Sequence, residues 1–180
     1  MNSRDLSRRG HTAPMRVQLP LIDRLIDDAP DAASDRPLSA TQTEEALRYA
    51  VRRDLEALLN ARRRWQSWRS GYAELGTSLL GYGICDFASG AFNDPDQRNR
   101  LRAGIEWAIR TFEPRLAAVQ VTLVDRGDAL DTTLRLRIDA MLRTEPGPEP
   151  IAFDTLVDSA TAEVQVKTNS AAPTTTPSDV

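Results

Sequence analysis

Apolar residues recur at helical spacing in a first long stretch of the chain. They form one stripe of a helix that we expect to reach about Asn60, namely Leu47, Val51, Leu55, Leu58 and Leu59. Thr41 and Glu44 have the spacing of a capping box, in which each side chain bonds the backbone of the other residue. The pattern therefore predicts a helix that begins near Thr41.

A second stretch repeats this pattern with stronger end signals. Its apolar stripe consists of Leu101, Ile105, Ala108, Ile109 and Phe112. Asp94 can cap the helix, and Pro95 suits the first helical position, where no backbone donor is needed. Pro114 restricts the residue before it, so the helix should end close to Thr111.

The pattern then changes to strict alternation, which is typical of half-buried strands. Val119, Val121 and Leu123 alternate with polar residues, and a turn is expected at 125–128. The next strand has an inward set of Leu134, Leu136, Ile138, Ala140 and Leu142. A rigid loop is expected at 145–150, and a third strand at 161–167. Helices followed by a small, mainly antiparallel sheet define the α+β class.

A short apolar segment precedes these elements. On a helix, Leu21, Ile22, Leu25 and Ile26 share one face. Two turns are too few to be stable alone in water, so we expect this short N-terminal helix to dock. It docks either on its own domain or, as a tethered segment, on a partner.

Length and composition set the domain organisation. The 180 residues suffice for one domain with a hydrophobic core but hardly for two. We expect a disordered N-terminus at 1–15, a docking segment and linker at 16–40, a folded domain at 41–168 and a disordered tail at 169–180. No apolar run of roughly 18 residues and no leader pattern is evident, which predicts a cytoplasmic protein.

Charge gives little support for nucleic-acid binding. The net charge is −3, and the most basic stretch, 62–69, also carries two tryptophans. One short patch on an acidic chain favours a helix end that covers the domain or meets a protein partner. We therefore predict no nucleic-acid partner.

Candidates for catalysis and metal binding are few. Cys85 is the only cysteine and His11 the only histidine, which makes a catalytic triad or a metal site of these residue types improbable. Cys85 is expected to be a small buried residue. Glu113 and Asp86 are the best pair of carboxylates for glycoside hydrolysis, but acidic residues are too common here to single them out. We predict no catalytic residue, metal or cofactor.

Three residues at the junction of helix and strand have two interpretations. Glu113 and Arg115 place opposite charges around the helix-breaking Pro114. In one interpretation, Arg115 pairs with Glu113 or with the helix end, and the turn is self-contained. In the other, the proline fixes the backbone and the arginine offers a two-pronged hydrogen-bond donor to a partner.

Several segments together resemble the TssE family of baseplate proteins from bacterial type VI secretion systems. They are Leu21–Leu25, Val51–Asn60, Ser78–Gly83, Ala108–Leu116 and Phe153–Thr155. The similarity covers roughly residues 17–167, and its most specific part is Glu113-Pro114-Arg115, which is shared with a wedge protein of contractile-tailed phages. It departs at Cys85, where the family usually has proline.

This resemblance implies a structural role at an inner-membrane-docked baseplate, without direct insertion into the membrane. The implied partners are the baseplate proteins TssF, TssG and TssK and the sheath subunits TssB and TssC, whose assembly the family is thought to template. Glu113, Pro114 and Arg115 would contact the core of the wedge. We hypothesise that the hairpin and strand 161–167 face the sheath, because an unpaired sheet edge can accept another strand.

Some family members carry a lysozyme-like label, so the alternative function is peptidoglycan hydrolysis. It would need an acid and a nucleophile in facing positions. The sequence offers no credible pair, and the expected function is therefore not enzymatic.

Overall fold

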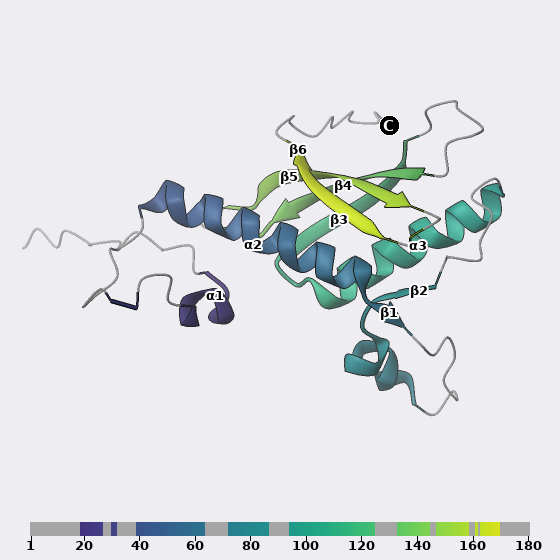
Figure 1. Cartoon of the computed structure of the whole chain (residues 1–180), viewed down its shortest axis with the longest axis horizontal. Helices are drawn as coiled ribbons and strands as arrows, with labels where there is room; N and C mark the ends of the chain where they lie inside the picture. The colour runs from purple at the N-terminus through teal and green to yellow at the C-terminus, as the bar shows by residue number, and fades with distance from the viewer. Residues whose placement is uncertain are drawn as a thin grey trace, which may run out of the picture.

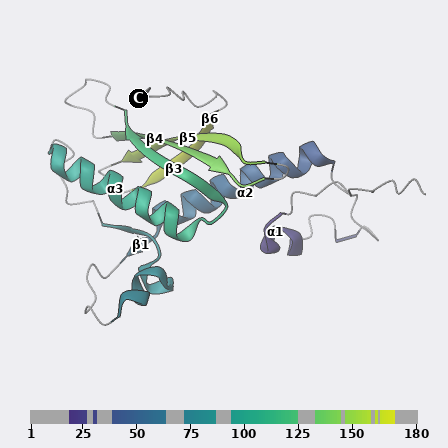
Figure 2. The ribbon, with the colours of Figure 1, turned by 180° about the vertical axis from the view of Figure 1, so that it is seen from behind.

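The computed structural model describes residues 19–26, 30–31, 39–63, 72–86, 94–124, 133–144, 147–158, 161 and 163–169. Two long helices, α2 (Ala40–Asn60) and α3 (Pro95–Phe112), lie against one face of a four-stranded sheet (Figure 1). The short helix α1 (Leu21–Leu25) lies on the other side of α2 from the sheet, as the view from behind also shows (Figure 2). The predicted α+β class is confirmed.

The sheet is antiparallel throughout and follows the order of the chain. Its strands are β3 (Leu116–Leu123), β4 (Thr133–Leu142), β5 (Glu149–Asp158) and β6 (Val164–Asn169). Along β4 every second side chain is buried, as the alternation predicts for a strand with one face on the core. The hairpin of β3 and β4 is confirmed, and its expected turn at 125–128 lies outside the described residues.

The hydrophobic core lies between the two helices and the sheet. All five residues of the predicted stripe on α2 are buried, as are Ile105, Ala108 and Ile109 of α3. Leu101 and Phe112 are partly buried at the margin of this core. Asp94 caps α3 by accepting from the backbone of Asp96 at 3.0 Å, and Pro95 follows it at the first position, as predicted.

A bulge in β3 keeps its apolar residues on the core side. The register with β4 shifts between Ala117 and Gln120, and Ala118 has a φ of 49°. An extra residue in one strand reverses the alternation that follows it. Leu116 and Val119 are therefore both buried although three positions separate them.

The stretch 72–86 contains short elements. These are the 3₁₀ helices η1 (Ala73–Thr77) and η2 (Leu79–Gly81) and the strand β2 (Ile84–Cys85), which pairs in parallel with β1 (Arg62–Arg63). Gly83 has a φ of 100°, and a Cβ there would meet the Ala61 carbonyl. A glycine is thus required where this segment comes against the end of α2.

The start of α2 differs from the prediction. The helix begins at Ala40, and its capping box joins Ser39 to Gln42 and not Thr41 to Glu44. Gln42 Oε1 accepts from the Ser39 backbone at 3.0 Å, and Ser39 Oγ accepts from the Gln42 backbone at 3.3 Å. Both pairs have the spacing of a capping box. The pair of Ser39 and Gln42 forms because the helix extends to Ala40, directly after Ser39.

The sequence interpretation also missed the strand β5. The predicted loop at 145–150 includes Glu149 and Pro150, yet β5 begins with these two residues. Pro150 faces Met141, and β6 pairs only with 152–157, so the missing N–H of the proline lies beyond the end of β6. A proline is tolerated where no ladder bond is needed. The last strand, expected at 161–167, runs from Val164 to Asn169.

Candidate functional site

The junction between α3 and β3 is a buried turn. The backbone N–H of Glu113 donates to the Ile109 carbonyl at 2.9 Å and ends the helix, and the N–H of Leu116 donates to the Glu113 carbonyl at 3.1 Å. Glu113 is only 4% exposed, whereas Pro114 is exposed. A carboxylate in such a position needs a partner, because burying an unpaired charge is costly.

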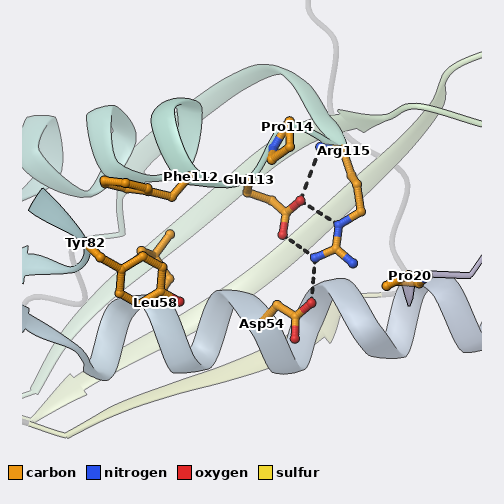
Figure 3. Close-up of a pocket in the computed structure, with 8 residues that line it drawn as sticks. All are labelled: Pro20, Asp54, Leu58, Tyr82, Phe112, Glu113, Pro114 and Arg115. Carbon is orange, nitrogen blue, oxygen red and sulfur yellow. Dashed lines mark hydrogen bonds and ion pairs between the residues drawn. The ribbon is translucent and has the colours of Figure 1, made fainter. Parts of the chain in front are cut away.

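Arg115 provides this partner and joins a second carboxylate to it. Its Nε donates to Glu113 Oε1 at 2.6 Å, and its Nη2 contacts Glu113 Oε2 (Figure 3). The same Nη2 donates to Asp54 Oδ2 of α2 at 2.7 Å. Burial acts to lower the pKa of Arg115, but the hydrogen bonds and charges of Glu113 and Asp54 outweigh it and raise that pKa above the ordinary value.

These contacts agree with the first of the two interpretations of the turn, in which Arg115 pairs within the chain. Arg115 pairs with Glu113, as in the self-contained turn, and it also reaches α2. Its guanidinium is therefore engaged within the chain and holds the end of α3 against α2. Contact of the turn with a partner stays a prediction.

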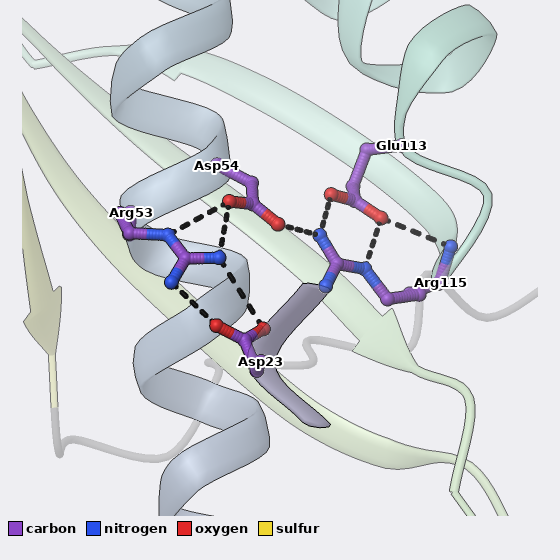
Figure 4. Close-up of polar contacts among 5 residues, drawn as sticks. All are labelled: Asp23, Arg53, Asp54, Glu113 and Arg115. Carbon is purple, nitrogen blue, oxygen red and sulfur yellow. Dashed lines mark hydrogen bonds and ion pairs between the residues drawn. The ribbon is translucent and has the colours of Figure 1, made fainter. Parts of the chain in front are cut away.

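The ion pairs continue from Asp54 to α1 through Arg53. Arg53 donates to Asp54 Oδ1 at 2.9–3.0 Å and to Asp23 Oδ1 at 2.5 Å (Figure 4). The resulting ion-pair chain is Asp23, Arg53, Asp54, Arg115 and Glu113. The hydrogen bonds of Asp23 and then of Asp54 raise the pKa of Arg53. The chain connects the N-terminal segment, α2 and the turn.

Helix α1 meets its own domain through its polar side. The Asp23 side chain is 15% exposed, because it faces Arg53. By contrast, the four apolar residues of α1 and its end, Leu21, Ile22, Leu25 and Ile26, are 54–74% exposed. The idea that this apolar face docks on its own domain is thus wrong. The predicted helix is confirmed, and its apolar face points to solvent.

A groove of about 360 Å³ lies beside the ion-pair chain. It is lined by Pro20, Asp54, Leu58, Tyr82, Phe112, Glu113, Pro114 and Arg115 (Figure 3). The rings of Tyr82 and Phe112 meet edge to face with their centroids 5.3 Å apart. The groove therefore joins the segment before α1 to the turn and combines apolar walls with carboxylates.

The pKa of Tyr82 reflects the burial and the negative charge in this groove. Burial, followed by the negative charges of Asp54 and Glu113, raises the pKa of its phenol. The difference in phenolate absorbance between wild type and Tyr82→Phe should titrate with a midpoint above the ordinary value of about 10. Since the unfolded chain ionises first, Tyr82 should make folding less stable as the pH rises beyond about 10. A midpoint at or below that value would contradict this picture of the groove.

The basic stretch and Cys85 meet at the other end of α2. Arg62 Nη1 donates to the Leu59 carbonyl at 2.8 Å, and Arg63 Nη2 donates to Cys85 Sγ at 3.0 Å. Arg63 also lies over the Trp107 ring, 5.4 Å from its centroid. Cys85 is only partly buried, which corrects the prediction of a buried residue, and it pairs with Arg63 in the short β1–β2 sheet. Residues 64–71 lie outside the described residues.

The two carboxylates considered for catalysis lie in different surroundings. Glu113 is bound by Arg115, while Asp86 is exposed at the end of β2. Within the described part of the chain, no group of three or more His, Cys, Asp or Glu is placed to hold a metal ion. His11 lies outside that part. Among the described helices, none has the length and apolar character to cross a membrane.

Three residues of this site were not singled out by the sequence interpretation. Asp23, Arg53 and Asp54 lay inside segments that carried the resemblance, but no role followed from their positions. In the sequence, the one feature that these three residues share is a charge beside the apolar stripe of a predicted helix. Their pairing across 30 and 61 positions of the chain required the fold.

The described surface thus combines an exposed apolar helix face with a turn held by buried ion pairs, on an α+β fold. A family model described as baseplate wedge protein gp25 matches residues 45–147, more than half of the 180 residues. The chain belongs to this family of structural baseplate components, which confirms the resemblance noted above and does not support an enzyme. A comparison with curated proteins found no match.

Proposed function

We propose that the chain is the TssE-type wedge subunit of a bacterial type VI secretion system. Family membership gives it a structural baseplate role and implies contact with other baseplate proteins. The finer proposal is that it binds TssF, TssG and TssK at a baseplate docked on the cytoplasmic side of the inner membrane. It then templates the first ring of TssB and TssC sheath subunits.

The observation that carries the wedge contact is the outward apolar face of α1. Leu21, Ile22, Leu25 and Ile26 are all exposed, while Asp23 ties the helix to Arg53. A helix held in this way presents its apolar side chains as anchors for a groove on another protein. Because exposed apolar area is unfavourable in water, its burial by a partner would supply much of the binding energy.

The turn of Glu113, Pro114 and Arg115 forms the adjoining part of the same proposed surface. Pro114 is exposed on the wall of the groove, and Pro20 lines the groove from the α1 side. Glu113 and Arg115 hold this wall in place from within. We therefore assign the partner contact to Pro114 and the α1 face, and the positioning of that contact to the two charged residues.

Co-purification with TssF, TssG and TssK tests this function. Wild type should form a stable complex, and the double variant Leu21→Asp/Leu25→Asp should bind at least about 30-fold more weakly. This estimate takes about 2 kcal/mol or more for two leucines that can no longer be buried. Because both side chains are exposed in the free chain, the variant should unfold at the same urea concentration as wild type.

Arg24→Ala is the matched control, since Arg24 is exposed on the same helix and lies outside the apolar face. It should bind like wild type. If the double-aspartate variant binds as tightly as wild type, α1 takes no part in the contact. A wild-type chain that binds none of the three proteins would overturn the proposed assignment.

A further inference from the structure

Two contacts fix helix α1 to the rest of the chain. Leu19, which lies just before the helix, is partly buried against the hydrophobic core. Four positions later, the Asp23 carboxylate meets Arg53 of α2: Oδ1 accepts from Nη1 at 2.5 Å, and Oδ2 accepts from Nη2 at 3.3 Å. A packed leucine at one end would leave the helix free to turn about its own axis. The two-pronged ion pair removes that freedom, because it holds a second point on the helix.

The rotation of α1 decides where its apolar face points. With 3.6 residues per turn, Asp23 lies on a different side of the helix from the four apolar residues. The Asp23 side chain is 15% exposed, whereas each of those four residues is more than half exposed. The apolar face is therefore held outward for as long as Asp23 stays on Arg53.

Helix α1 is too short to be stable by itself. It has five residues, far fewer than the roughly 12–15 that an isolated helix needs in water. Among its backbone bonds, the Arg24 N–H donates to the Pro20 carbonyl at 3.2 Å, and the Ile26 N–H donates to the Ile22 carbonyl at 3.1 Å. These bonds depend on the contacts that α1 makes with the domain, and they report on whether the contacts are present.

Arg53 is itself held in place by its neighbours. Its Nε and Nη2 donate to Asp54 Oδ1 at 3.0 and 2.9 Å, while Asp54 Oδ2 accepts from Arg115 at 2.7 Å (Figure 4). The planar guanidinium is thus oriented from the side of α2, and it turns its remaining edge to Asp23. Little side-chain freedom is left to lose when Asp23 binds, so the ion pair forms at low entropic cost.

We propose that Asp23 and Arg53 are positioning residues for the partner contact, because their ion pair holds α1 in the orientation in which its apolar face can be buried by a baseplate protein. The inference rests on the proposed function, since it takes α1 to be part of that contact. A partly exposed ion pair is modest in strength, so α1 exchanges between a held and a released state. A partner that binds the held state alone loses affinity in proportion to the released fraction.

Amide hydrogen exchange of the isolated full chain tests the holding of α1 without any partner. In Arg53→Glu, the amides of Arg24 and Ile26 should exchange about ten-fold faster than in wild type, because repulsion from Asp23 replaces the attraction. Asp23→Arg/Arg53→Glu brings opposite charges together again with their signs exchanged, and should restore most of the protection. Unchanged exchange in Arg53→Glu would show that the ion pair does not hold the helix.

Arg52→Glu is the matched control, since it makes the same change of charge one position earlier on α2. The partners of Arg52 include the Glu56 side chain at 2.8 Å and the Val166 carbonyl at 3.3 Å. The two α1 amides should therefore exchange as in wild type. The Arg98 amide, which donates to the Asp94 carbonyl at the start of α3, is the internal reference in every variant. Equal release of α1 by Arg52→Glu and Arg53→Glu would mean that net charge is the cause, and the inference would fail.

Binding to TssF, TssG and TssK tests whether the held orientation matters. Arg53→Glu should bind about three- to ten-fold more weakly than wild type, and Asp23→Arg/Arg53→Glu should bind nearly as well as wild type. When Leu21→Asp/Leu25→Asp is already present, Arg53→Glu should cause no further loss, because no apolar face remains to be positioned. A further loss in that background would mean that Arg53 contacts the partner directly, which contradicts a positioning role.

The remaining outcomes separate the inference from the proposed function. If Arg53→Glu releases α1 and still binds as tightly as wild type, the held orientation is not needed, and the inference fails while the proposed function stands. If the wild-type chain binds none of the three proteins, the proposed function fails, and the inference fails with it. Urea unfolding checks that each variant is folded, which is expected because Arg53 is 36% exposed.

Discussion

Replacing Arg115 with alanine is expected to lower the free energy of unfolding by about 3–5 kcal/mol, which is the usual cost of leaving one partner of a buried ion pair alone. Glu113 is 4% exposed and receives two side-chain contacts and one backbone N–H from Arg115. Without the guanidinium, its carboxylate would stay buried without a countercharge. Urea unfolding of wild type and variant at neutral pH measures the difference.

Two further variants show whether the effect comes from burial of the charge. Glu113→Gln/Arg115→Ala removes both charges and should recover part of the lost stability, since no ion is left unpaired. Arg53→Ala interrupts the same ion-pair chain where the side chain is 36% exposed, and should cost about 1 kcal/mol or less. If Arg115→Ala costs no more than Arg53→Ala, the turn is not held by a buried pair.

A second large loss is expected when Phe153 is replaced by alanine. Phe153 is fully buried near the middle of β5, opposite Ile138 of β4. Removing a buried phenylalanine costs about 3–5 kcal/mol, part of it from the cavity that remains. Since small domains are stable by only about 5–15 kcal/mol, the variant should unfold at a much lower urea concentration.

Leu156→Ala is the control within the same strand. Leu156 is half-buried on the opposite face of the sheet, three positions further along. Its replacement should cost about 1 kcal/mol or less, because little is enclosed around it. Similar losses for both variants would mean that the register of β5 on β4 is not the one described.

Elements with strong local signals could be predicted from the sequence. Asp94 and Pro95 mark the start of α3, and the alternation from Leu134 to Leu142 fixes both the strand and its buried face. Helix α2 begins earlier than predicted because Ser39 and Thr41 both begin a capping-box pattern, and the pair that forms is the one at Ser39. Which pair forms depends on how far the helix can extend, and spacing alone does not decide that.

The strand β5 could not be predicted because its first residues carry a loop signal. Prolines crowd the stretch before Ile151, and a central strand should not contain one. The structure resolves this conflict because the described part of β6 pairs with β5 only as far as Ala152, so that among the described residues Pro150 has no strand partner on that side. The length of a neighbouring strand is not visible in the local pattern.

The candidate site could be predicted in its parts but not in its connections. The amphipathic segment at Leu21–Ile26 and the turn at Glu113 were both recognised from local pattern. Their link through Arg53 and Asp54 was not, because a charge on a helix surface has many possible partners. Only the packing of α3 against α2 brings Arg115 to Asp54 and selects that pair.

The position of α2 between α1 and the sheet has a mechanical consequence in the proposed assembly. Baseplate proteins would bind α1 on one side of α2, and a load taken up by the sheet on the other side would reach α1 in part through α2 (Figure 1). The helix would carry that load over its 21 residues, and the hydrophobic core that it shares with the sheet holds it in place.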